Sequence, residues 1–245
     1  TQEALPNAKI IARFIDAVHD GGMHLKPTGA GDTRKYIVSP TDQLNRIKSF
    51  GVNGRSAYFG NEPSGKVSID DKRRLVDHTC EAMDLAATRD YDMSLTILNW
   101  GAMHPTIIDG MLDPAFDQIL ITLNRHRNRH YYGLHVYAPM SLTAELDALK
   151  ATCAKLKIPL PRIVITEMGF DNDGTDSLNG FKSRNMSNET FAAWCISACR
   201  INLRSWLESG DILGVATFIY GDDAAWKNFN IETGTHGEVS TAWRD

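Results

Sequence analysis

The sequence lacks the patterns that mark several common classes of protein. Its four cysteines do not have the spacing of a zinc site. No Gly-Lys-Ser/Thr or Gly-x-Gly-x-x-Gly motif opens a helix, and His-Glu-x-x-His does not occur. No apolar run approaches the length of a membrane span. The sequence therefore gives no reason to expect a binding site for nucleotide phosphates, a bound metal, another cofactor or a membrane partner.

The charge balance is also unremarkable in sign and size. A formal net charge of -4 provides no electrostatic reason to expect a nucleic acid or an anionic membrane as partner. The chain has 245 residues, of which 42% are apolar and 23% are charged, as in a globular protein with a substantial core. We therefore expect a single domain over residues 1–245.

The cysteines are expected to be buried free thiols, because cysteine packs as a small apolar residue. Cys195 and Cys199 are four residues apart on one face of a predicted helix, but no second pair completes a metal site. Disulfide frameworks are typical of much shorter secreted chains. The cysteines therefore do not indicate whether the protein lies in an oxidising or a reducing compartment.

Apolar strand-like runs alternate with amphipathic helical segments along the whole chain, which predicts an α/β fold with a parallel sheet. Each predicted strand is short and apolar, as is typical of strands buried on both faces. The predicted helices include a segment from about 189 to 207. The six predicted strands lie near residues 8–14, 55–60, 94–99, 132–137, 162–166 and 212–220.

Two of these apolar runs end at a glutamate and pass into a turn. One contains Phe59-Gly60-Asn61-Glu62-Pro63, and the other contains Ile165-Thr166-Glu167-Met168-Gly169. Strands of a parallel sheet present their carboxyl ends at one edge, where Glu62 and Glu167 could face each other. Hydrolysis of a glycosidic bond needs two such carboxyls, one as acid and one as nucleophile or base.

The Asn-Glu-Pro and Thr-Glu-Met-Gly motifs resemble those of the clan of retaining glycoside hydrolases with a (β/α)8 TIM barrel. The resemblance implies that Glu62 ends the fourth strand as acid/base and that Glu167 ends the seventh as nucleophile. It implies that Asn61 holds the sugar 2-hydroxyl. The implied substrate is a β-linked oligo- or polysaccharide, and no metal or cofactor is required.

Further substrate-binding candidates follow from the same resemblance. His135 and Tyr137 share one face of their predicted strand, and the clan often has a His-x-Tyr pair here with the tyrosine hydrogen-bonded to the nucleophile. A core histidine and a packed aromatic are the alternative. Trp100, at a strand end, offers a plane for sugar stacking. The clan usually has a tryptophan at the end of strand eight, on which the sugar stacks. Trp226 or Tyr220 could take this role here. Packing in the core is the alternative for both residues.

The strand count departs from the clan, since a TIM barrel has eight strands. If Glu62 ends the fourth strand, residues 8–14 form the third and the first two are missing. We therefore expect that the protein has an N-terminal segment absent from this sequence. Alternatively, residues 23–26 or 34–38 supply an irregular strand.

Two rival functions remain open. One is a catalytically inactive barrel that binds glycan within a larger assembly, such as a virion. The other is an unrelated TIM-barrel enzyme, such as an aldolase or isomerase, which a lysine at a strand end or a phosphate site would favour. The location of the protein stays open, with an extracellular or virion-associated location slightly favoured over the cytoplasm.

Overall fold

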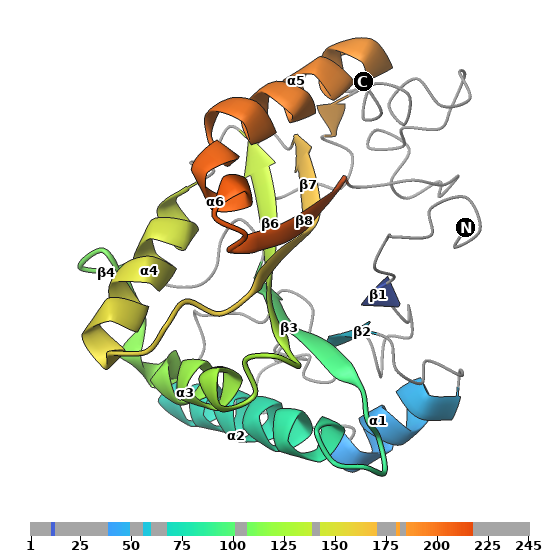
Figure 1. Ribbon diagram of the computed structural model, residues 1–245, viewed down its shortest axis with the longest axis vertical. Coiled ribbons are helices and arrows are strands. Elements are labelled where there is room, and N and C mark those ends of the chain that lie inside the picture. Colours follow the sequence, from blue (N-terminus) through green and yellow to red (C-terminus); the bar gives the residue numbers. More distant parts are fainter. Residues whose placement is uncertain are drawn as a thin grey trace, which may run out of the picture.

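The central feature of the fold is a six-stranded parallel sheet. The computed structural model describes residues 11–12, 39–49, 56–59, 68–100, 107–138, 143–170, 180–181 and 185–217. Within this part of the chain the strands are ordered β1-β2-β3-β6-β7-β8 across the sheet (Figure 1). The strands are β1 (Ile11–Ala12), β2 (Ser56–Phe59), β3 (Ser94–Trp100), β6 (Tyr131–Ala138), β7 (Ile163–Phe170) and β8 (Ile212–Thr217).

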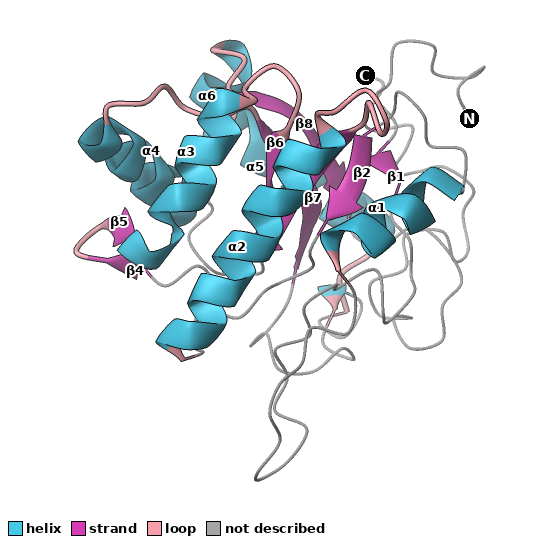
Figure 2. Cartoon of the chain, turned by 90° about the horizontal axis from the view of Figure 1, so that it is seen from below, coloured by secondary structure: helices cyan, strands magenta, loops and turns pink. Residues whose placement is uncertain are grey.

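All neighbouring strands in this sheet are parallel, and each pairs with the next main strand along the chain. The helices that connect them form an arc along one side of the sheet (Figures 1 and 2). This arrangement confirms the predicted α/β alternation and the parallel sheet. The helices are α1 (Pro40–Ser49), α2 (Ile69–Ala86), α3 (Asp117–Arg125), α4 (Ala144–Leu156), α5 (Asn188–Ile201) and α6 (Arg204–Glu208), with a 3₁₀ turn η1 (Pro114–Phe116) before α3.

A small hairpin between β3 and α3 was not expected from the sequence. It pairs β4 (Ile107–Ile108) with β5 (Met111–Leu112) in antiparallel fashion. Its turn is Asp109-Gly110, and both residues have positive φ, 51° and 74°. Two successive positive φ angles are the requirement of a type I′ turn, for which Asp-Gly is a favoured sequence. The dipeptide was thus a readable signal for this hairpin.

The single helix expected from about residue 189 to 207 is wrong, because α5 and α6 are separate helices. The carbonyl oxygen of Ala198 accepts hydrogen bonds from two successive amides, those of Asn202 (2.9 Å) and Leu203 (3.2 Å). Helix α5 ends where these two amides share one carbonyl oxygen. The buried Leu203 lies in the connecting turn, so the apolar pattern continues through the break and conceals it.

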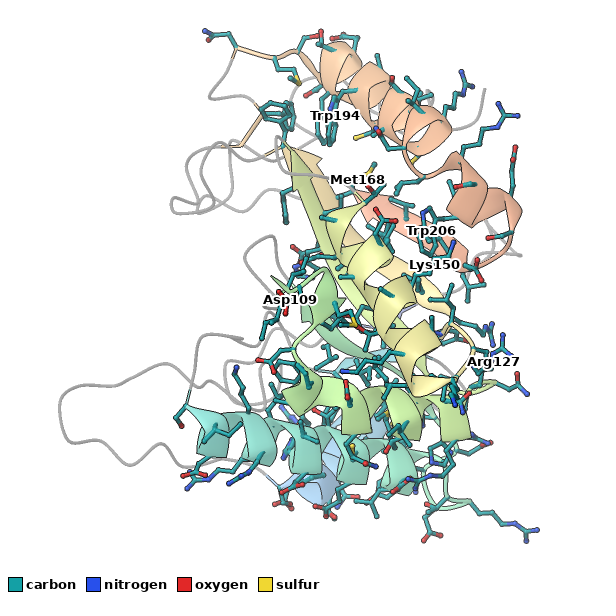
Figure 3. The ribbon with its side chains drawn as sticks, turned by 90° about the vertical axis from the view of Figure 1, so that its left-hand side faces the viewer. Asp109, Arg127, Lys150, Met168, Trp194 and Trp206 are labelled. Carbon is teal, nitrogen blue, oxygen red and sulfur yellow. The ribbon has the colours of Figure 1, made fainter. Side chains whose placement is uncertain are left out.

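Helix α5 is fixed to the end of β7 by aromatic contacts. Phe170, the last residue of β7, lies 5.7 Å from the ring of Trp194 in an edge-to-face arrangement, and Figure 3 shows Trp194 on α5. Trp194 stacks on Phe191, which in turn stacks on Phe181 at 4.2 Å between centroids. Aromatic pairs of this kind contribute about 0.5–1.5 kcal/mol each beyond burial. They hold the carboxyl end of β7 in place.

The core lies between the sheet and the helices, and three cysteines belong to it. Cys153, Cys195 and Cys199 are buried and Cys80 is partly buried; all four are free thiols, as expected. Burial raises the pKa of Cys153 to about 11 and that of Cys195 to about 12. Among the described residues, the largest fully buried side chains are Tyr132, Phe59, Phe181, Phe191, Leu44, Leu75, Met83, Met93, Leu95 and Ile97.

Two buried histidines support the helix side of the sheet. The Nδ1 atom of His130 accepts a hydrogen bond from the backbone N–H of Leu95 (3.1 Å), and its Nε2 lies 2.9 Å from the carbonyl oxygen of Met83. A carbonyl only accepts, so Nε2 carries the proton and the ring is neutral. His78 contacts the side-chain oxygen of Gln43 through Nε2 at 3.2 Å. Burial lowers the pKa of both histidines from 6.5 to about 4.

These histidines make stability depend on pH. An unfolded histidine takes up a proton below pH 6.5, whereas folded His130 and His78 do so only near pH 4. Their stabilising contribution is therefore complete above pH 6.5 and is lost as pH falls from about 6.5 to about 4. Since one unit of pKa is about 1.4 kcal/mol, the loss is about 3 kcal/mol per histidine. Urea unfolding across this range should show it.

The variant His130→Asn isolates one contribution. We expect its deficit in unfolding free energy relative to the wild type to be largest above pH 6.5 and to shrink as pH approaches 4. Both proteins keep His78, whose contribution cancels in the difference. Glu145, whose pKa burial raises to about 9, contributes with the opposite sign in this window and cancels as well. A deficit independent of pH would contradict the prediction.

Candidate active site

Glu167 lies in the carboxyl-terminal half of β7, where the strand contains a bulge. Leu134 of β6 pairs with Ile165, but the next residue, His135, pairs with Glu167. Thr166 is therefore an extra residue in β7 with no partner of its own in the ladder. A β-bulge of this kind redirects the side chains that follow it. The Glu167 side chain is largely buried, with 7% of the residue exposed.

The carboxylate of Glu167 is held from the neighbouring strand. Tyr137 donates a hydrogen bond of 2.6 Å from its hydroxyl to Oε2 of Glu167. Nδ1 of the buried His135 lies 3.4 Å from the same oxygen. The two groups form an ion pair only when the imidazole is protonated. The two rings meet edge to face at 6.4 Å. His135 and Tyr137 thus share one strand face, as predicted, and both lie at Glu167.

A glycine provides the space for the Tyr137 ring. Gly169 pairs with Tyr137 across the two strands. A Cβ atom at Gly169 would lie 2.7 Å from Cε1 of Tyr137, far inside van der Waals contact. Glycine in a strand interior often marks such a close approach. The Gly of the Thr-Glu-Met-Gly motif therefore lets the tyrosine lean over β7 and reach Glu167.

Asn99 is a site residue that no motif in the sequence predicted. Its side chain is fully buried in β3. Its Nδ2 donates to the carbonyl oxygen of Thr96 (3.0 Å) and, at 3.5 Å, to that of Phe59 in β2. Its Oδ1 accepts a 3.0 Å hydrogen bond from the hydroxyl of Thr166, next to Glu167. Asn99 therefore links β2, β3 and β7.

The link between β3 and β7 passes over β6, which lies between them in the sheet. Gly133 of β6 makes the crossing possible, because a Cβ atom there would lie 2.1 Å from Oδ1 of Asn99. The glycine inside the apolar run Tyr132-Gly133-Leu134 is the sequence feature from which a close approach at this strand could have been predicted.

Several predicted site residues lie outside the described part of the chain. These are Asn61, Glu62, Tyr220 and Trp226, so their roles stay predictions. Trp100 is the last residue of β3, but its side chain is also outside the description. Strand β2 ends at Phe59, three residues before Glu62 in the sequence. The structure therefore brings together Glu167, His135 and Tyr137, and adds Asn99 and Thr166.

Comparison with known proteins identifies no family. No protein-family model matches the chain, and no curated protein sequence is significantly similar to it.

Among the described residues, no group of three or more histidine, cysteine, aspartate or glutamate side chains could hold a metal ion. None of the described helices combines the length and apolarity that crossing a bilayer requires.

Proposed function

We propose that this protein is a glycoside hydrolase that cleaves a β-linked oligo- or polysaccharide with retention of configuration. The observation that carries the proposal is the setting of Glu167. Its carboxylate lies in the carboxyl-terminal half of a parallel strand and accepts a 2.6 Å hydrogen bond from Tyr137 on the adjacent strand. The predicted partner of a nucleophilic glutamate thus lies within hydrogen-bond reach of it.

We further propose that the sheet belongs to a TIM barrel. In a doubly wound sheet the strand order reverses at a switch point, which is where ligands bind. In a barrel each strand pairs with the next one along the chain, and the helices lie outside. The order β1-β2-β3-β6-β7-β8, with helices along one side, follows the second pattern. Eight strands would require two beyond those described.

In the proposed reaction, a carboxylate oxygen of Glu167 attacks the anomeric carbon as the glycosidic C–O bond breaks. Glu62 gives its proton to the departing oxygen. Water then attacks the same carbon, Glu62 takes up a proton from it, and the ester bond to Glu167 breaks. Retention requires the two carboxyls to be about 5–5.5 Å apart.

Tyr137 suits the first step because it is a neutral hydrogen-bond donor. Its hydroxyl is the donor in the 2.6 Å hydrogen bond, so it can orient the Glu167 carboxylate without neutralising its charge. The hydrogen bond fixes one oxygen and hence the plane of the carboxylate. Holding a nucleophile near its attack geometry is a principal source of rate enhancement.

Hydrolysis of a panel of α- and β-linked aryl glycosides and soluble polysaccharides tests the proposal. We expect release of the aglycone from at least one β-glycoside, and proton NMR at early times should show the β-anomer of the free sugar as first product. An α-anomer as first product would show inversion and exclude Glu167 as nucleophile. Glycan binding without any hydrolysis would favour the non-catalytic alternative.

A further inference from the structure

Strand β3 has an unusual backbone at Asn99. Leu98 and Asn99 have positive φ angles of 68° and 45°. The left-handed conformation costs roughly 1–2 kcal/mol for an ordinary residue, and two successive cases in a strand are sustained only where the surroundings determine them. Here β3 advances three residues, from Ile97 to Trp100, while β6 advances two. The extra residue places the Asn99 side chain toward β7.

The hydrogen bonds of Asn99 fix which way its amide faces. Nδ2 is directed at two backbone carbonyls, those of Thr96 and Phe59. Carbonyls accept only, so the NH₂ group must face them and Oδ1 must face Thr166. The hydroxyl of Thr166 lies 3.0 Å from that oxygen and 3.3 Å from the carbonyl oxygen of Leu134. Both oxygens only accept, so the hydroxyl donates its single proton, and Oδ1 of Asn99 is the closer acceptor.

The bulge at Thr166 determines on which face of the sheet the Glu167 side chain lies. Were β7 to pair without its bulge, Thr166 would lie opposite His135, and Glu167 would lie opposite Val136. Side chains alternate between the two faces, and a slip of one residue exchanges them. Glu167 would then be on the face away from His135 and Tyr137. The bulge at Thr166 returns Glu167 to the side of both residues.

We propose that the hydrogen bond between Asn99 and Thr166, here called the Asn99–Thr166 bridge, positions Glu167 for catalysis. It holds the extra residue of β7 in its bulge and ties β7 to Phe59, at the end of the strand that leads to Glu62. Asn99 and Thr166 are thus positioning residues. This inference rests on the proposed function for its kinetic consequence, but its geometric consequence can be tested separately.

The test compares three threonine variants of the whole chain. Thr166→Val removes the hydroxyl of the bridge and keeps the branched shape, whereas Thr166→Ser keeps a hydroxyl. The matched control is Thr152→Val, away from the site. The buried Thr152 hydroxyl donates to Ala148 O (2.8 Å) and accepts from Leu112 N (2.9 Å). Its removal tests for loss of stability alone.

We expect Thr166→Val to lower kcat by about 10²-fold, the loss that accompanies a misplacement of about 1 Å, with KM changed less than about twofold. Thr166→Ser should retain most of the wild-type kcat, and Thr152→Val should lower the melting temperature without lowering kcat. Equal losses of kcat in Thr166→Val and Thr152→Val would overturn the inference, because they would indicate general destabilisation.

Crystal structures of the wild type and Thr166→Val provide the second measurement. In the variant we expect the distance from the Tyr137 hydroxyl to Oε2 of Glu167, 2.6 Å here, to exceed hydrogen-bond length. An unchanged distance would overturn the positioning role of the bridge, whether or not kcat changes. If the wild type hydrolyses no glycoside, the proposed function fails, and the distance alone then decides for or against the positioning role. Asn99→Gly, which suits the left-handed backbone, is the second variant if Thr166→Val does not fold.

Discussion

Replacement of Glu167 by glutamine is expected to lower kcat for glycoside hydrolysis by about 10⁴–10⁶-fold, the range seen when a residue of a covalent catalytic unit is removed. An amide carries no negative charge and does not attack an anomeric carbon effectively. Glutamine matches glutamate in shape, and its carbonyl oxygen can still accept the Tyr137 hydrogen bond. The loss should therefore appear in kcat while the melting temperature changes little.

The matched control is Glu208→Gln in α6, where the exposed carboxylate pairs with Arg204 at 2.7 Å. This substitution removes the same charge from the surface and should leave kcat unchanged. A further check is Glu167→Ala supplemented with formate or azide, in which a small anion can take the place of the missing carboxylate. Retention of more than about a tenth of wild-type kcat by Glu167→Gln would rule out a nucleophilic role.

The second large effect is on stability. Gly133→Ala is expected to lower the free energy of unfolding by about 3 kcal/mol, because the new methyl group would lie 2.1 Å from Oδ1 of Asn99 and 3.0 Å from Ile97 O. Overpacking costs about 1–3 kcal/mol, and turning Asn99 away leaves buried polar groups unpaired at about 1–3 kcal/mol. For a chain of this size the melting temperature should fall by about 6–12 °C.

Gly214→Ala in β8 is the matched control, because a Cβ atom there has no neighbour within 4 Å among the described atoms. It should be neutral or stabilising by up to about 1 kcal/mol, through the loss of chain entropy in the unfolded state. In the double variant Gly133→Ala/Asn99→Gly the clashing amide is gone. The two substitutions should therefore destabilise less together than the sum of their separate effects. Additive losses would contradict the clash.

The parallel sheet was predictable because strands buried on both faces form continuous apolar runs in the sequence. The runs at 94–99 and 132–137 correspond to β3 and β6, and the run at 162–166 is the first part of β7. Helix ends were less predictable. The break at residues 202 and 203 depends on which amides share the Ala198 carbonyl, and Leu203 keeps the apolar spacing through it.

The candidate site was predictable only in part. Alternation alone places His135 and Tyr137 together, and an apolar run ending in a glutamate pointed to Glu167. Asn99 and Thr166 were not found, because their roles depend on bulges that shift the pairing of β3 and β7 against β6. Neither bulge can be read from one strand's periodicity. The roles of Asn61, Glu62, Trp100, Tyr220 and Trp226 stay predictions.

The Asn99–Thr166 bridge also bears on synthesis of the chain. Its two residues are 67 positions apart, so at about 5–20 residues per second the ribosome takes roughly 3–13 s to add Thr166 after Asn99. During that interval Oδ1 of Asn99 has no Thr166 hydroxyl from which to accept a hydrogen bond, although Thr96 and Phe59, whose carbonyls accept from Nδ2, are already synthesised. Nascent chains that end before Thr166 should therefore not bury this residue, and protease sensitivity near Asn99 should disappear only in longer nascent chains.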